Sequence, residues 1–396
     1  MRKLYVDYAA TTPLDPKVFK AMKPYFTEMY GNASSIHSYG IEAKQAIAKS
    51  RKIVAELLTA EPEELIFTGS ATEANNTALK GHAFKQGKEK ASIAISSIEH
   101  DCVLNTAIWL EQQGYRVTTI PVDKYGLLKL EELKKALRKS VSLVSIIHAN
   151  NEIGTIQPLK EIGNLCHEHN ALFHTDAAQS FGKIPINVKK MNIDLMTINA
   201  HKIYGPKGVG ALYVRKGVEI DPLLHGGGHE FGLRSSTENV PGIVGFAKAV
   251  ELRKKEMGPE ATRLRKLKNH LVKEILNIED TYLNGHPKKN LPNIANFRFS
   301  YIEGESLLLL LDKEGIAAST GSACSSATGK PSHVLSALGI KPEELHGSLR
   351  LSLGKKNTQA DIDYILNIIP KIVKRLRSIS PIKKIKTWTS QHNQKI

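Results

Sequence analysis

The amino-acid sequence predicts an α/β fold, with a large domain built on a mostly parallel, doubly wound sheet and a smaller α+β domain beside it. Three observations lead to this prediction. Short apolar segments alternate with amphipathic stretches over most of the chain, which is typical of parallel sheets covered by helices. The alternation stops near Val240. In addition, the 396 residues exceed what a single hydrophobic core usually holds.

Seven apolar segments have the length and composition of buried strands, and several end in glycine or polar residues. They are residues 65–68, 92–96, 116–122, 143–148, 172–176, 195–198 and 210–214. Amphipathic helices are expected between most of them, at residues 41–58, 102–113, 130–137 and 159–169. The large domain is therefore expected to contain a seven-stranded sheet with helices packed on it.

A different pattern follows Val240. A long charged helix that includes residues 248–273 precedes two short apolar segments, 296–299 and 305–312. This shift predicts the second domain, which the N-terminal arm is expected to join. We expect a large domain at 14–256, a small domain made of 1–13 and 257–380, and a flexible basic tail at 381–396.

Composition excludes several classes of protein. No apolar run approaches the roughly 18 residues of a membrane span, and the segment from Met1 to Asp7 lacks the apolar stretch of a signal peptide. Three cysteines cannot form a disulfide framework. We therefore expect a cytoplasmic protein without a membrane partner.

The formal net charge of +16 is spread along the chain, and the only dense basic cluster is residues 383–386. The chain has no zinc-finger spacing, RNP-type motif or basic helix with heptads, so direct nucleic-acid binding is not expected. A solvated basic surface, or one that docks an acidic protein or a tRNA-modifying enzyme, fits the charge better.

Two predicted strands end in residues of complementary chemistry. Asp176 ends the segment 172–176, and Lys202 follows the segment 195–198. Strand ends of this kind face the ligand crevice of an open parallel sheet. The lysine could form a Schiff base with the aldehyde of pyridoxal 5'-phosphate, while the carboxylate keeps the ring nitrogen protonated. Taken alone, the two residues are more typical of an ordinary ion pair.

Three further strand ends carry polar groups. Gly69, Ser70 and Thr72 lead into a helix, which suits a phosphate group but also an ordinary helix N-cap. His100 follows the segment 92–96 and could lie over a cofactor ring, although a structural role is more usual. Residues 150–154, which include Asn151, offer amides that could bond a ring oxygen of the cofactor or a substrate carboxylate, although asparagine in such a turn usually serves the turn itself. The coincidence of these groups favours the cofactor hypothesis.

With these segments in place, the chain resembles the fold-type I pyridoxal-phosphate enzymes, and within the class-V aminotransferase family it resembles cysteine desulfurases of the NifS/IscS type. The likeness extends in order from residue 5 to about residue 370. The matching segments are 5–12, 32–37, 68–76, 98–100, 150–154, 176–179, 200–210, 225–230, 234–237 and 319–325.

The resemblance implies roles around the cofactor ring. Lys202 would form the Schiff base, Asp176 would pair with the ring nitrogen and Gln179 would bond the ring hydroxyl. His100 would stack on the ring and help to move protons.

The resemblance also implies a phosphate site made of Ala71, Thr72 and His201, with Thr237 contributed by the second subunit of a homodimer. Members of the family commonly carry serine where this chain has Asn199. An asparagine amide can still donate a hydrogen bond to phosphate. Cofactor affinity could therefore differ at this position.

Asn151 and Arg350 would orient the carboxylate of the substrate, L-cysteine, since a guanidinium is a natural bidentate partner. Cys324 lies in a loop, 318–330, that is rich in small and polar residues, and the resemblance implies that its thiolate takes the sulfur as a persulfide and leaves L-alanine. Cys102 and Cys166 are expected in the core.

No metal site is expected, because the side chains of residues 166–169 would diverge around a helix and residues 225–229 look like close-packed backbone. The sulfur acceptor is expected to be a protein such as an iron–sulfur scaffold or a tRNA-thiolation enzyme. Two alternatives stay open at this point: a selenocysteine lyase or related β-lyase, and a catalytically silent sulfur-transfer scaffold.

Overall fold

The computed structural model describes residues 3–321 and 331–380. Its helices are α1 (Pro16–Met22), α2 (Pro24–Thr27), α3 (Ser38–Leu58), α4 (Ala71–Lys90), α5 (Asp101–Gln112), α6 (Leu130–Leu137), α7 (Leu159–Glu168), α8 (Val240–Ile275), α9 (Gly304–Lys313), α11 (His333–Ala337), α12 (Pro342–Leu345) and α13 (Gln359–Ile379). Within the described ranges, none of these helices is long and apolar enough to cross a membrane.

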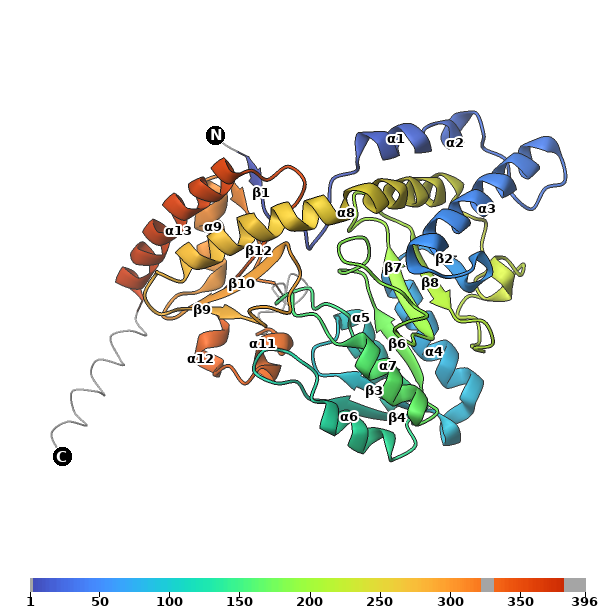
Figure 1. The fold of residues 1–396 in the computed structure, drawn as a ribbon, viewed down its shortest axis with the longest axis horizontal. Helices are drawn as coiled ribbons and strands as arrows, with labels where there is room; N and C mark the ends of the chain where they lie inside the picture. Colours follow the sequence, from blue (N-terminus) through green and yellow to red (C-terminus); the bar gives the residue numbers. More distant parts are fainter. Residues whose placement is uncertain (1–2, 322–330, 381–396) are drawn as a thin grey trace.

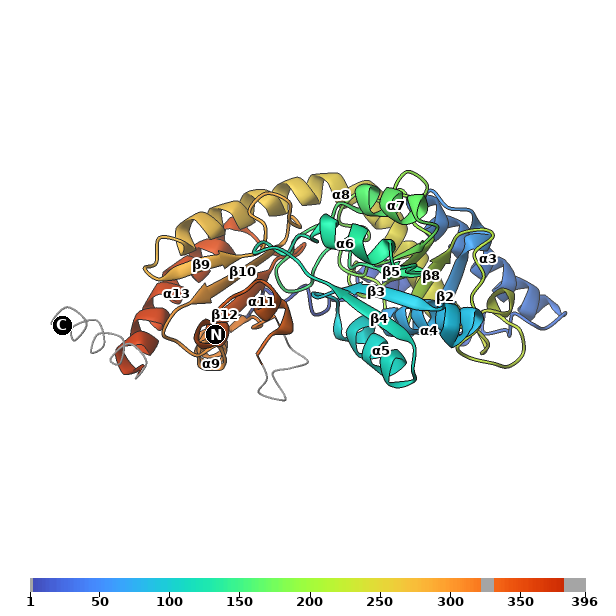
Figure 2. The same ribbon diagram turned by 90° about the horizontal axis from the view of Figure 1, so that it is seen from below.

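A seven-stranded sheet forms the larger lobe, in the order β2-β8-β7-β6-β5-β3-β4 (Figures 1 and 2). Its strands are β2 (Leu65–Thr68), β3 (Ser92–Ser96), β4 (Arg116–Ile120), β5 (Leu143–Ser145), β6 (Leu172–Asp176), β7 (Leu195–Asn199) and β8 (Gly210–Val214). Only β8 runs against its neighbours in this sheet. The predicted fold class, a mostly parallel sheet of seven strands, is confirmed.

Two predicted strands are shorter than expected. The segment 116–122 ends at Ile120, because Pro121 has no backbone N–H to donate to a neighbouring strand. The segment 143–148 ends at Ser145, although the chain stays close to β6 through bonds from Ile146 and His148.

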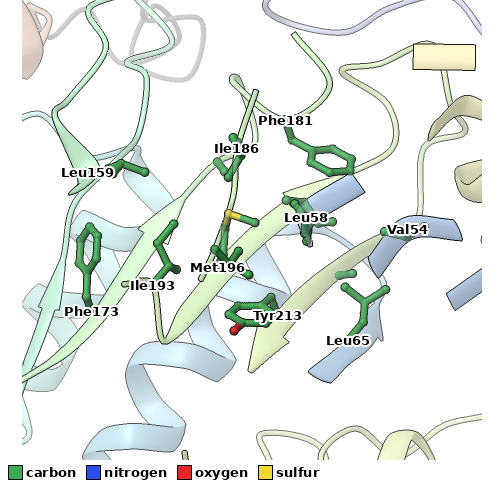
Figure 3. Packing of buried hydrophobic residues seen from close by; sticks show 14 of the residues in the cluster. Val54, Leu58, Leu65, Leu159, Phe173, Phe181, Ile186, Ile193, Met196 and Tyr213 are labelled. Atoms are coloured by element: carbon green, nitrogen blue, oxygen red, sulfur yellow. The ribbon is translucent and has the colours of Figure 1, made fainter. Parts of the chain in front are cut away.

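Helices cover both faces of this sheet because its buried strands are apolar on both sides. On β6 to β8, Phe173, Met196 and Tyr213 point into the cluster that packs α3, α7 and α8 (Figure 3). The preceding residue of each strand points into a second cluster, which includes side chains of α4 and α5. The sheet is therefore doubly wound, as the alternation of segments predicts.

The smaller lobe holds an antiparallel sheet, β12-β10-β9, and a parallel pair, β1-β11. The strands are β1 (Leu4–Tyr5), β9 (Thr281–Asn284), β10 (Ile294–Phe299), β11 (Ile316–Ala317) and β12 (Ser348–Ser352). Their apolar residues share a core with the C-terminal half of α8 and with α9 and α13. Helix α8 runs along both lobes, and β1 brings the N-terminal arm to the smaller one (Figure 1).

Candidate active site

A cavity of about 460 Å³ lies between the two lobes, at the carboxyl ends of β6 and β7. This volume is within the range of small-molecule sites. Ten of the expected site residues line it: Ala71, Thr72, His100, Asn151, Asp176, Gln179, Asn199, His201, Lys202 and Arg350. The structure therefore brings together groups that lie up to several hundred residues apart in the chain.

Lys202 reaches the cavity from the turn that follows β7. Its Nζ donates to the backbone carbonyl oxygens of Ala9, at 2.6 Å, and Ala10, at 2.5 Å. The N-terminal arm thus holds the amine at the cavity wall, where an aldehyde could reach it.

Asp176, the last residue of β6, has both carboxylate oxygens engaged. Oδ1 accepts from the backbone amide of Ala178 at 2.8 Å, and Oδ2 accepts from the side-chain amide of Asn75 at 2.7 Å. The carboxylate is 4% exposed and lines the same cavity as Lys202. The fixed acceptor is suited to a ring N–H.

The N-terminus of α4 provides donors for an anion. Ser70 is the N-cap, and its hydroxyl accepts from the amide of Glu73 at 3.1 Å. Ala71 and Thr72, in the first turn, line the cavity. The first amides of a helix have no partner within the helix, so this 20-residue helix directs N–H groups and its positive dipole end toward the cavity.

His201 and Asn199 add polar groups to this wall. The Nδ1 of His201 lies 3.1 Å from the hydroxyl of Thr11. Burial, and then the charge of Lys202, lowers the pKa of His201 to about 4, so the ring is neutral near pH 7. The buried Oδ1 of Asn199 has no hydrogen-bond partner among the described residues. The free amides at the N-terminus of α4 and the N–H of neutral His201 are donors that would fit a phosphate group, and Asn199 would join them only through its amide nitrogen.

Gln179 has a fixed amide orientation. Its Nε2 donates to the carbonyl of Ala9 at 2.8 Å, and its Oε1 accepts from Lys183 Nζ at 3.0 Å. Burial, followed by the charge of Lys202, lowers the pKa of Lys183 to about 7. Lys183 could not be predicted as part of the site, because its position in the turn after β6 gives no sign of this contact.

Arg350 enters the cavity from β12 of the smaller lobe. Its Nη2 pairs with Asp7 Oδ1 at 2.7 Å, and its Nη1 donates to the carbonyls of Asn151, at 2.9 Å, and Gly321, at 3.2 Å. Its Nε is buried without a hydrogen-bond partner in the described part of the chain. The guanidinium is thus held in place, while the Nε–H and the second N–H of Nη2 have no partner among the described residues. Sequence analysis gave no role to Asp7.

His100 is the N-cap of α5, and its Nδ1 accepts from the amide of Cys102 at 3.2 Å. The Cys102 sulfur lies 3.1 Å from the same nitrogen. Cys166 is in the core as expected. The expectation was wrong in part for Cys102, which packs against the core on one side but also lines the cavity. The helical periodicity of α5 predicts which side chains face the core, but it cannot show that a cavity lies beside the first turn of the helix.

Glu99 lies directly before His100 and is fully buried. Its Oε1 accepts from the hydroxyl of Ser96 and from the amide of Ile147, the latter at 2.8 Å, whereas Oε2 has no partner among the described residues. Desolvation raises the pKa of Glu99 to about 8, so the carboxyl group is mostly protonated at neutral pH.

Thr237 does not line this cavity. It lies in a neighbouring hollow of about 200 Å³, which shares Gly69, Gly208 and Val209 with the main cavity. Cys324 lies outside the described residues, so the structure gives no position for the expected nucleophile.

A lysine, a carboxylate at the end of the neighbouring strand and a helix N-terminus, all facing one cavity of an α/β sheet, define a pyridoxal-phosphate enzyme of fold type I. The donors described above fit the ring and phosphate of this cofactor. The chain belongs to the class-V aminotransferase family, whose model matches residues 4–365, and within it to the cysteine desulfurases of the NifS/IscS type.

Individual relatives agree with this assignment. The chain is 53% identical over 378 residues to "Cysteine desulfurase IscS 1" of Archaeoglobus fulgidus, covering 96% of this chain and 99% of the relative. A solved "NIFS-LIKE PROTEIN" is 41% identical, with a TM-score of 0.89 over 95% of this chain and 100% of the other. A structure described as "SspA in complex with cysteine" is 40% identical, with a TM-score of 0.80 over 89% and 99% of the two chains.

Proposed function

We propose that this protein is a cysteine desulfurase that converts L-cysteine into L-alanine and keeps the sulfur as a persulfide on Cys324. One observation carries the proposal: Asp176 at the end of β6 and Lys202 in the turn after the neighbouring strand β7 line one cavity with Arg350 from the other lobe. In the overall reaction, the carbon–sulfur bond of cysteine breaks, a sulfur–sulfur bond forms at Cys324 and a proton replaces sulfur on the product carbon.

Pyridoxal phosphate, when bound, withdraws electrons from the substrate carbons and thereby activates the bond to sulfur. Asp176 offers a fixed acceptor to the ring nitrogen, and Lys202 supplies the amine that attaches the cofactor. Gln179, oriented by Lys183, can present its second amide N–H to the ring hydroxyl. His100 can move a proton at the ring face.

The phosphate would lie at the N-terminus of α4, held by the amides of Ala71 and Thr72. Neutral His201 can donate one N–H, and Asn199 can donate through its amide, in the place of the hydroxyl that the family commonly has. Each of these contacts is a hydrogen bond to a charged group, and such bonds are the stronger class.

The carboxylate of L-cysteine would bind Arg350, whose Nε is unpartnered and whose Nη atoms are fixed. The amide of Asn151 could supply a second donor. Because Asp7 already pairs with Arg350, the substrate would share the guanidinium with this carboxylate rather than replace it.

We further propose a homodimer in which Thr237 completes the phosphate site of the partner subunit. Two observations support it: Thr237 lies outside its own chain's cavity, and large apolar side chains are exposed on α1 and α2, in the connection between α2 and α3, and in the segment before Thr237. Their exposed fractions are 56% for Phe19, 58% for Phe26, 66% for Tyr30, 95% for Ile36 and 58% for Phe231.

The division into a large domain at 14–256 and a small domain made of 1–13 and 257–380 is also a proposal, and the separate hydrophobic cores of the two lobes support it. The formal net charge of +16 suits an acidic acceptor protein, such as an iron–sulfur scaffold or a tRNA-thiolation enzyme. A cytoplasmic location would give such acceptors access to the enzyme.

Incubation of the holoenzyme with L-cysteine tests the function. Mass analysis should find L-alanine and one extra sulfur on the peptide that contains Cys324. Cys324→Ser should still change the cofactor absorption when cysteine is added, but should form no persulfide. Cys166→Ser is the control, since that thiol is in the core and should not affect sulfur transfer. Persulfide on another residue of Cys324→Ser, or no alanine from the wild type, would refute the proposal.

A further inference from the structure

Four side chains beside the cavity form a continuous chain of polar contacts. Asn75 Nδ2 lies 2.7 Å from Asp176 Oδ2 and 3.1 Å from Cys102 Sγ, and that sulfur lies 3.1 Å from His100 Nδ1. The residues come from β6, from α4, and from the N-cap and first turn of α5. These contacts connect Asp176, the proposed partner of the ring nitrogen, to His100, which is proposed to stack on the cofactor ring.

The direction of each contact follows from donor chemistry. The Asn75 amide nitrogen must face Asp176, because the reverse orientation would place its oxygen against a carboxylate oxygen. The second N–H of this amide can then donate to the Cys102 sulfur. A sulfur that accepts from Asn75 can donate its own S–H to His100 Nδ1, which lies 3.1 Å away, while the Thr72 side chain also lies within hydrogen-bonding reach of the thiol.

His100 Nδ1 also accepts from the backbone amide of Cys102, so the proton of the neutral ring must be on Nε2. The thiol is well suited to remain a donor, since burial and then the Asp176 charge raise the pKa of Cys102 to about 12.

We propose that Cys102 is a positioning residue, whose S–H joins its own backbone amide in keeping His100 Nδ1 an acceptor, and thus the ring in its Nε2–H tautomer, and links the ring through Asn75 to Asp176. This inference rests on the proposed function and deepens it, since the tautomer decides what His100 can do. A neutral imidazole held in this way can give a proton from Nε2 but cannot accept one there.

Infrared spectroscopy of the holoenzyme tests the contact without reference to activity. The S–H stretching band that Cys102→Ala removes should lie at lower frequency than the band that Cys166→Ala removes, because the Cys166 thiol lies in an apolar core cluster. His100→Phe should raise the Cys102 band and leave the Cys166 band in place. An unmoved Cys102 band would overturn the proposal.

Kinetics test the positioning role. Cys102→Ala should lower kcat for L-cysteine about tenfold, the order expected for one buried hydrogen bond, with KM little changed. Cys102→Ser, which can donate and accept in the same place, should restore most of kcat, whereas Cys166→Ala should leave it unchanged. An equal loss in the Ala and Ser variants, or none in either, would refute the role. Absent desulfurase activity in the wild type would refute the proposed function instead, while the infrared result would still stand.

Discussion

The buried carboxyl group of Glu99 predicts a specific dependence of stability on pH, which Glu99→Gln should remove. Burial raises the pKa of this group from 4.5 to about 8. The native protein therefore keeps a proton that the unfolded chain releases above about pH 4.5. Since the native state binds more protons in this window, its stability must fall as pH rises from about 4.5 through about 8.

The size of the effect follows from the shift. One pKa unit corresponds to about 1.4 kcal/mol, so the cost of Glu99 is about 2 kcal/mol near pH 6 and reaches at most about 5 kcal/mol above pH 8. Glutamine keeps the carbonyl acceptor for Ser96 and Ile147 but does not titrate. The stability of Glu99→Gln relative to wild type should therefore increase by about 3 kcal/mol between about pH 6 and pH 9.

Urea unfolding of both proteins at the two pH values, followed by circular dichroism, measures this difference. The other titrating groups cancel in the comparison because the two proteins share them. Infrared spectra at neutral pH give an independent measure, since the variant should lose one C=O band of a protonated carboxyl group. Identical pH dependence in the two proteins, with no band lost, would refute the assignment of a neutral Glu99.

Three other predictions concern the site and the smaller lobe. Arg350→Lys should raise KM for L-cysteine by about tenfold or more, because a single ammonium cannot replace the forked guanidinium; an unchanged KM would mean that the carboxylate binds elsewhere. Lys202→Ala and Thr237→Ala chains, each impaired alone, should regain activity when mixed, since each mixed dimer has one intact site; confirmed mixed dimers without recovery would exclude a shared site. Burial lowers the pKa of Lys268 to about 7, so the stability of wild type relative to Lys268→Met should rise with pH between about 7 and 10.5, measured by urea unfolding. A flat difference across that window would contradict a buried, largely neutral amine.

Much of the fold could be predicted because its information is local. The strand segments are short apolar runs, and both faces of β6 and β7 are buried, so these runs show no polar alternation. The reversal of β8 could not be predicted, since the same composition suits either direction of pairing. The pairing of β1 with β11 is also invisible to local patterns, because it joins Leu4 to Ile316.

Some residues of the site could likewise be predicted from local sequence, whereas others could not. Asp176 and Lys202 could be found because Asp176 ends a strand and Lys202 lies in the turn after the next one, and strand ends converge on one edge of a parallel sheet. Lys183 and Asp7 could not, because they act on the site through Gln179 and Arg350, which are contacts of tertiary structure. The sequence around Cys102 is apolar with helical periodicity, and it correctly predicts packing against the core. It contains no signal for the cavity beside the helix.

The N-terminal arm has a consequence for how the protein is made. Its carbonyls hold Lys202, Asp7 pairs with Arg350, and the amide of Ala9 bonds to Ser352, across 343 residues of sequence. A growing polypeptide emerges from the ribosome with this arm already formed and its partners still untranslated. The last contacts of the catalytic centre can therefore close only after β12 has been synthesised.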